Sequence, residues 1–299
     1  ALMASVPDDT ANKKRVVRDM VVEFMATTVF VYTGTLSAVA TGYWEQANSN
    51  HGGNLPDVAR VMPIAMSFGI SIMALAFSIG HLTGGHMNPG VSLTMFFKRQ
   101  MSLVKMLSYW AAQFLGGLLG AALMWGSTSN LQYFPTGEDG ELGNPPFFLG
   151  STTLSPHISV GNGFLLEFMG SFFFYFVIAQ TACDKRGAAT SLFPPIPIGF
   201  ILIVVHICLI PFTGCGVNPA RTFGPSMISC MSGVDCSLVA NQEWYWIYFV
   251  GPFLASFVVA EVTLWMEWDV DAVDTVEAET GEDDLQKCDT APSADVADV

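Results

Sequence analysis

Long apolar runs alternate with short polar stretches along most of the chain. Six of these runs approach the length of roughly 20 residues that an α-helix needs to cross the hydrocarbon core of a bilayer. They lie near residues 17–42, 59–81, 103–126, 163–183, 195–212 and 243–266. The pattern predicts an all-α membrane protein with six transmembrane helices, and it places long external loops from Tyr43 to Val58 and from Ser127 to Asn162.

Two polar stretches broken by proline interrupt the apolar pattern, one after the second run and one after the fifth. They contain Asn88-Pro89-Gly90 and Asn218-Pro219-Ala220. Asparagine suits a helix N-cap and proline suits the first helical position, so each stretch predicts a short helix. Irregular backbone is tolerated at bilayer depth only where it is buried in protein or lines a water-filled cavity. Paired half-helices in corresponding places therefore predict an inverted repeat.

Composition excludes an ordinary soluble domain. Charged residues make up only 13% of the chain, whereas soluble domains carry about 25%. The formal charge of −14 lies mostly at the C-terminus, because twelve carboxylates and one lysine occur from Glu267 onward. The segment after Trp268 contains no aromatic residue, so a solvated, disordered tail is preferred there over a specific partner site.

The basic residues are distributed unevenly over the two sides that six spans define. Ten Lys and Arg residues fall on the side of both termini, whereas Arg60 alone lies on the other side. Positively charged loops mark the cytoplasmic face of membrane proteins. Both termini are therefore expected to be cytoplasmic.

The paired boxes, the second followed by Arg221, resemble the Asn-Pro-Ala signature of the aquaporin (major intrinsic protein) family. The likeness extends from about Val17 to Trp268. It implies a channel domain at 19–268, with repeats at about 19–126 and 163–266, between a cytoplasmic tail (1–18) and the acidic tail (269–299). Gly90 stands where alanine is usual, and an early-helix glycine costs about 1 kcal/mol relative to alanine, so we expect a slightly looser first half-helix.

The resemblance also implies a pore constriction. Phe68, His206, Cys215 and Arg221 match, position by position, the aromatic/arginine filter of water-selective family members. Such a filter selects by diameter, by the donors and acceptors that line it, and by electrostatic barriers. Glycerol-conducting relatives typically have aspartate directly after the arginine and glycine in place of the histidine, where this chain has Thr222 and His206.

Three further residues resemble those that brace the re-entrant loops of the family. Glu23 and Glu167 lie in spans 1 and 4, within segments that look like copies of each other, and His86 precedes the first box. An ionisable group inside a span is costly and normally faces a partner or water. This structural role is therefore preferred over proton transport, and over metal binding for His86.

Other positions are candidates for regulation. Ser102 aligns with a loop serine of plant plasma-membrane aquaporins that a kinase could modify, although a plain helix N-cap is preferred. Phe193 is placed near the cytoplasmic mouth, and a true plug is disfavoured there. Cys230 and Cys236 follow the second half-helix on the external side, where an oxidising exterior permits a disulfide and two free thiols are the alternative.

The leading hypothesis is thus a passive water channel in a lipid bilayer, excluding ions and protons. The resemblance implies a homotetramer in the plasma membrane, and no enzyme activity, cofactor, bound metal or nucleic-acid partner is expected. One alternative is a channel that also conducts a small neutral solute such as hydrogen peroxide, ammonia or urea. Another is a structural membrane-junction protein.

Overall fold

Helices account for all regular secondary structure in the part of the chain that the computed structural model describes, namely residues 12–49, 58–128, 149–184, 193–232, 236 and 239–267. The elements are α1 (Lys13–Ser49), α2 (Val58–Thr83), α3 (Pro89–Phe97), α4 (Leu103–Thr128), α5 (Val160–Ile178), the π-helical turn η3 (Ala179–Cys183), α7 (Pro195–Thr213), α8 (Pro219–Met231) and a last helix (Ile247–Glu267).

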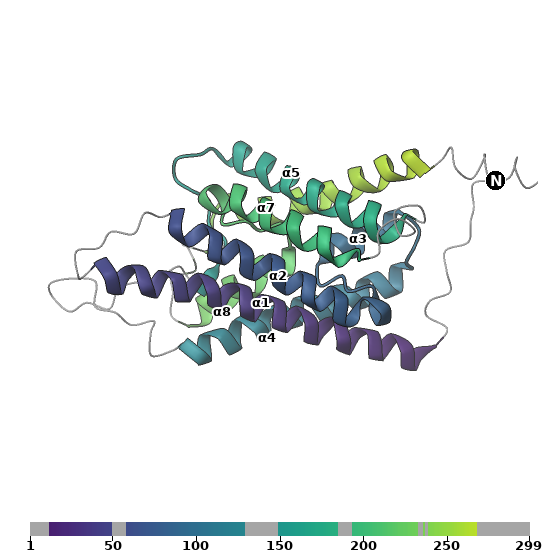
Figure 1. Cartoon of the computed structure of the whole chain (residues 1–299), viewed down its shortest axis with the longest axis horizontal. Helices are drawn as coiled ribbons and strands as arrows, with labels where there is room; N and C mark the ends of the chain where they lie inside the picture. The colour runs from purple at the N-terminus through teal and green to yellow at the C-terminus, as the bar shows by residue number, and fades with distance from the viewer. Residues whose placement is uncertain are drawn as a thin grey trace, which may run out of the picture.

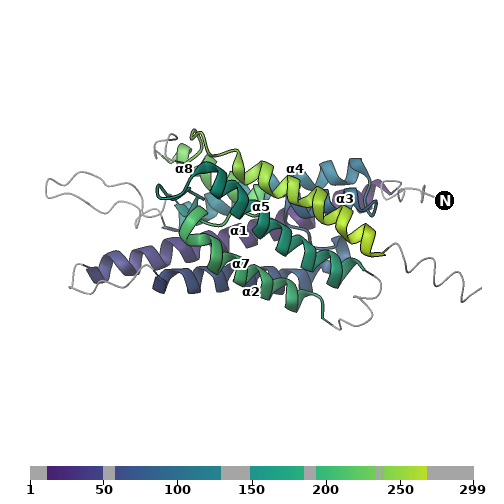
Figure 2. The same cartoon turned by 90° about the horizontal axis from the view of Figure 1, so that it is seen from above.

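Within the described ranges, six helices are long and apolar enough to cross a membrane, as the sequence predicted. Figure 1 shows the long helices running roughly along one axis of the molecule. The short helices α3 and α8 lie toward opposite ends of the bundle in both views (Figures 1 and 2). This arrangement confirms the expected fold class of six spanning helices and two half-helices.

The two ends of the spanning bundle can be told apart by the chain ends. Helix α1 starts, and the last helix stops, at the same end of the bundle (Figures 1 and 2). Ion pairs mark this end, since Lys105 Nζ lies 3.7 Å from Asp19 and Lys98 Nζ lies 2.7 Å from Glu267. Asp19 is almost fully buried, and no pattern in the sequence had singled it out.

Glycines in α4 bring this helix unusually close to two neighbours. A Cβ on Gly120 would lie 2.5 Å from the carbonyl oxygen of Thr28 in α1, and a Cβ on Gly117 would lie 2.5 Å from that of Ala220 in α8. Small residues at helix contacts are the usual way in which membrane helices pack closely. Helix α8 is thereby held directly against a spanning helix.

Helix α1 differs from the sequence prediction at both ends. Helix α1 continues to Ser49, where a loop from Tyr43 was expected, because the residues Glu-Gln-Ala at 45–47 are good helix formers. It also begins at Lys13, inside the segment predicted as a tail (1–18). The acidic tail (269–299) lies outside the described residues.

Candidate functional site

The two half-helices are capped by the asparagines of the paired boxes. Asn88 Oδ1 accepts a 2.8 Å hydrogen bond from the Gly90 amide. Asn218 Oδ1 accepts from the amides of Ala220 (3.0 Å) and Arg221 (3.3 Å). Both asparagines have extended backbone and are followed by proline at the first helical position. The N-caps are thus those that the sequence pattern predicted.

The caps are also bonded to each other's loops. Asn88 Nδ2 donates to the Val217 carbonyl at 3.0 Å, and Asn218 Nδ2 donates to the Met87 carbonyl at 2.8 Å. The hydroxyl of Tyr175 donates to the same Val217 carbonyl at 2.8 Å. The N-termini of α3 and α8 therefore meet inside the protein, and both present the positive end of a helix dipole there.

The first re-entrant loop is held by a buried carboxylate, that of Glu23. Its Oε1 accepts from the Thr83 hydroxyl (2.8 Å) and the His86 amide (2.9 Å). Its Oε2 accepts from the Met87 amide (2.8 Å) and Gln113 Nε2 (2.9 Å). Four donors offset much of the cost of burying this group.

Glu167 repeats the arrangement in the second half of the chain. It accepts from the Thr213 hydroxyl (2.6 Å) and from the amides of Gly216 (2.9 Å) and Val217 (2.7 Å). Val217 has a φ of 43°, which is a strained conformation for a β-branched residue. The carboxylate thus holds this loop in a backbone conformation that it would not adopt alone.

Buried tyrosines complete both loops, a role that no pattern in the sequence predicts. Tyr109 donates to the Thr83 carbonyl at 2.9 Å, and Tyr248 donates to the Thr213 carbonyl at 2.6 Å. His86 acts in the same structural way, because its Nδ1 lies 3.0 Å from the Ser92 hydroxyl. Only the chain fold brings the two tyrosines to the loops, so their spacing in the sequence carries no signal.

Three of the four expected filter residues are in direct contact. The rings of Phe68 and His206 are stacked with centroids 4.5 Å apart. The Arg221 guanidinium carbon lies 4.8 Å from the centroid of Phe68. Cys215, the fourth expected filter residue, is fully buried and precedes the N-cap of α8, the helix that carries Arg221. The structure therefore brings Phe68, His206 and Arg221 together.

Two buried nitrogens at this level have no hydrogen-bond partner among the described residues, His206 Nε2 and Arg221 Nε. His206 Nδ1 is 2.9 Å from the Leu202 carbonyl, and a carbonyl only accepts, so this nitrogen carries a hydrogen. In the neutral ring Nε2 is then an acceptor. Buried polar groups are normally satisfied by protein or water, so an acceptor and a donor are available here to a small polar molecule.

A segment before α5 orients Arg221, although no pattern in the sequence predicts this contact. The Gly150 carbonyl accepts a 2.8 Å hydrogen bond from Arg221 Nη1. Nearby, the Thr152 hydroxyl lies 3.3 Å from that of Thr222, and the Ser155 amide donates to the Phe212 carbonyl at 2.8 Å. The end of the long loop between α4 and α5 thus contacts Arg221 and its neighbour Thr222.

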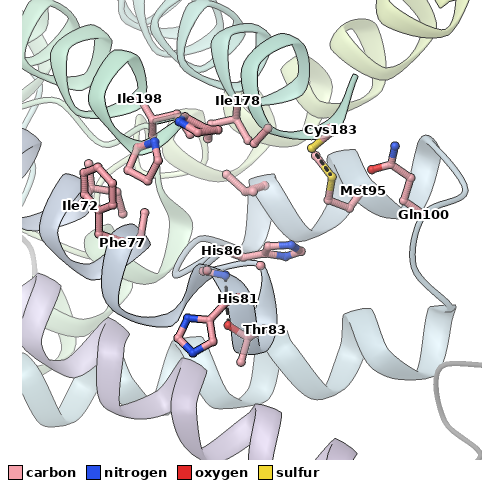
Figure 3. Close-up of a pocket in the computed structure, with 18 of the residues that line it drawn as sticks. Ile72, Phe77, His81, Thr83, His86, Met95, Gln100, Ile178, Cys183 and Ile198 are labelled. Carbon is pink, nitrogen blue, oxygen red and sulfur yellow. Dashed lines mark hydrogen bonds between the residues drawn. The ribbon is translucent and has the colours of Figure 1, made fainter. Parts of the chain in front are cut away.

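A cavity of about 600 Å³, called the vestibule below, opens at the end of the bundle that holds the chain ends. Figure 3 shows part of its lining, which is largely apolar, with Ile72 and Ile198 on one side and His86 near its floor. Phe193 lines its rim, 56% exposed, with its ring centroid 6.2 Å from that of Phe77. Phe193 therefore lies at a mouth and does not fill it.

The remaining candidates have clear positions. The Ser102 hydroxyl accepts a 3.2 Å hydrogen bond from the Lys105 amide, so it caps α4. Cys230 and Cys236 are joined by a disulfide bond after α8. No three His, Cys, Asp or Glu side chains converge as a metal site within the described residues.

Comparisons with known proteins agree with this geometry. A family model described as Major intrinsic protein matches residues 10–262. The chain is 32% identical to Aquaporin PIP2-4 of Oryza sativa subsp. japonica over 257 residues, covering 84% of this chain and 82% of the relative. It is also 32% identical to Aquaporin-1 of Bos taurus over 244 residues, covering 82% and 80%.

A solved structure shows the same fold. The aquaglyceroporin from Plasmodium falciparum superimposes with a TM-score of 0.67 at 20% identity, covering 82% of this chain and 94% of that one. The family match and the relatives extend over most of the chain and include both asparagine boxes and all four filter positions. The protein is therefore an integral membrane protein that belongs to the major intrinsic protein, or aquaporin, family of channels.

Proposed function

We propose that the protein is a passive, water-selective channel that excludes ions and protons. The observation that carries this proposal is the contact between Phe68, His206 and Arg221, beside two buried nitrogens that lack protein partners. The relatives named Aquaporin PIP2-4 and Aquaporin-1 support it as well.

Size selection follows from the packing of the filter. Stacked rings with centroids 4.5 Å apart leave no gap between Phe68 and His206, so the proposed passage runs along the edges of these rings, beside Arg221. A water molecule that enters loses hydrogen bonds to bulk water. His206 Nε2 can accept, and Arg221 Nε can donate, in their place. A bulkier solute would have to displace these rings from the passage.

Charge selection rests on Arg221. Its guanidinium is bonded to the Gly150 carbonyl, and the salt bridges of the described residues do not include it. The nearby Glu167 carboxylate is already bonded to its own loop. The positive charge therefore stays directed at the passage and repels cations.

Proton exclusion rests on the asparagine pair. An amide nitrogen carries two hydrogens, and Asn88 and Asn218 each use one in the bond to the opposite loop. The second hydrogen of each can bond the oxygen of a water molecule that passes between them. That molecule then points its own hydrogens away from both asparagines, which interrupts a chain of water molecules that would relay protons.

The placement of the protein is part of the proposal. The shared end of α1 and the last helix, together with Lys98 and Lys105 there, supports cytoplasmic termini. A homotetramer and a plasma-membrane location are inferred from the resemblance to plant plasma-membrane aquaporins.

Stopped-flow light scattering of proteoliposomes made with the purified full-length protein tests the proposed function. Vesicles with protein should shrink much faster than empty vesicles in an impermeant osmolyte. Glycerol and urea gradients should give solute entry no faster than in empty vesicles, and a pH-sensitive dye should show no added proton flux. Fast entry of glycerol or urea would contradict strict water selectivity, whereas unchanged water flow would contradict the channel itself.

A further inference from the structure

Three sulfur-containing side chains gather at the vestibule, away from the filter. Met95 belongs to α3, Met101 lies between α3 and α4, and Cys183 is the last residue of η3. All three line the vestibule. The Cys183 thiol donates to the Met95 thioether sulfur across 3.4 Å, as Figure 3 shows.

From this cluster we infer that Met95, Met101 and Cys183 form a binding site for a soft monovalent metal ion of the Cu(I) or Ag(I) type. Thiolate and thioether ligands select such ions, whereas carboxylates and imidazoles suit harder or borderline ones. The described part of the chain offers no cluster of three His, Cys, Asp or Glu side chains. The softness of the two thioethers and the thiol therefore favours Cu(I) or Ag(I) over harder metal ions at this site.

The surroundings favour ligation by sulfur. Met95 and Met101 are only 5% and 3% exposed and pack in one cluster, with Cys183 against it. Few water molecules can compete for an ion there, yet the vestibule gives the ion an entry path. Residue Cys183 also ends a π-helical turn, a rare element that frequently occurs at functional sites.

Binding of the metal ion replaces the hydrogen bond between Cys183 and Met95 by metal–sulfur bonds. The Cys183 S–H bond breaks, its proton passes to solvent, and the thiolate forms a bond to the metal ion without electron transfer. The lone pair of Met95 that accepted the thiol hydrogen then becomes a metal ligand. Metal–sulfur bonds are about 2.3 Å long, so the two sulfurs must move apart, which the flexible methionine side chain permits.

The test is anaerobic competition for Cu(I) between the detergent-solubilised full chain and a chromophoric Cu(I) chelator. Cys215→Ser serves as the reference protein, because the filter thiol can also bind soft ions. This reference should bind one more Cu(I) per chain than the Cys215→Ser/Cys183→Ser protein. Adding Met95→Leu to the reference should weaken that binding by about tenfold or more. Zn(II) added in place of Cu(I) should not bind to the cluster of Met95, Met101 and Cys183.

Met106→Leu is the matched control. Met106 is buried in the same cluster as Met95 but does not line the vestibule, so its replacement should leave the Cu(I) affinity unchanged. Equal Cu(I) stoichiometry with and without Cys183, or equal affinity of the Met95→Leu and Met106→Leu proteins, would overturn the inference. Thermal unfolding of each variant checks that the proteins are folded.

Discussion

The side chain of Tyr175 fills the space in which a methyl group at position 90 would lie. A Cβ on Gly90 would overlap the phenol oxygen of Tyr175. That oxygen donates to the Val217 carbonyl at 2.8 Å and lies 3.4 Å from Asn88 Oδ1. Glycine in the first box is therefore matched to a tyrosine of α5, a packing reason that the helix propensity of glycine alone did not reveal.

This relationship predicts a coupled effect on stability. Gly90→Ala should lower the free energy of unfolding by about 1–3 kcal/mol through overpacking. The loss should largely disappear in a Tyr175→Val background, where the methyl group has room. Thermal unfolding of the four proteins of this double-mutant cycle measures the coupling. Equal losses in both backgrounds would contradict it, and Gly80→Ala, with no atom near its Cβ, is the matched control.

The filter assignment predicts altered solute exclusion. Replacing Phe68 and His206 together by alanine removes both stacked rings and should admit glycerol or urea while largely preserving water flow. Stopped-flow measurement of solute entry into proteoliposomes gives the answer. Phe173→Ala, on an exposed face of α5, controls for the loss of an aromatic residue. If the double mutant still excludes both solutes, these rings do not set the constriction.

Two replacements of Arg221 distinguish the effect of its charge from the effect of its shape on ion exclusion. Arg221→Val removes the only charge of the filter side chains and should raise proton and cation flux into proteoliposomes. Arg221→Lys keeps the charge, although it cannot reproduce the planar contact with Phe68, and should retain most of the exclusion. Fluxes that stay at the parent level in Arg221→Val would remove the electrostatic role of this residue.

Particular residues show which parts of the fold and of the site could be predicted from the sequence. The spans and the two asparagine caps were predictable, because apolar length and the Asn-Pro pair are local signals. Contacts between distant segments were predictable only where the family resemblance supplied them, as for Glu23 and Glu167. Gln113 and Gly150 meet the site only through the fold, and nothing in the sequence shows that Gly34 leaves the space occupied by the ring of Phe68.

An ion pair between the buried Lys98 and the partly exposed Glu267 should stabilise the junction between α3 and the last helix. The Lys98 side chain is 0% exposed, and its ammonium donates to Glu267 (2.7 Å) and to the Thr263 hydroxyl (2.9 Å). Glu267→Gln leaves this charge without its counterion and should cost about 1–3 kcal/mol in the free energy of unfolding. Glu261→Gln, on an exposed face of the same helix, should cost much less. Equal melting temperatures of the two variants would contradict a stabilising role for the pair.

The final prediction concerns mercury and the thiol of Cys215. If Cys215 lines the constriction as proposed, its soft thiol should bind a mercuric ion. The bound ion would block water flow until a thiol reductant removes it. Cys230 forms a disulfide bond, and Cys208 lies exposed on α7. Replacing Cys215 by serine should therefore abolish the inhibition by mercury, whereas Cys208→Ser should leave it intact. The Cys183 thiol, in the vestibule, is the other free candidate among the described residues. Stopped-flow water permeability of the three single variants, each compared with its own untreated rate, identifies the blocking thiol. Inhibition that survives in Cys215→Ser and disappears in Cys183→Ser would move the block to the vestibule and remove Cys215 from the constriction.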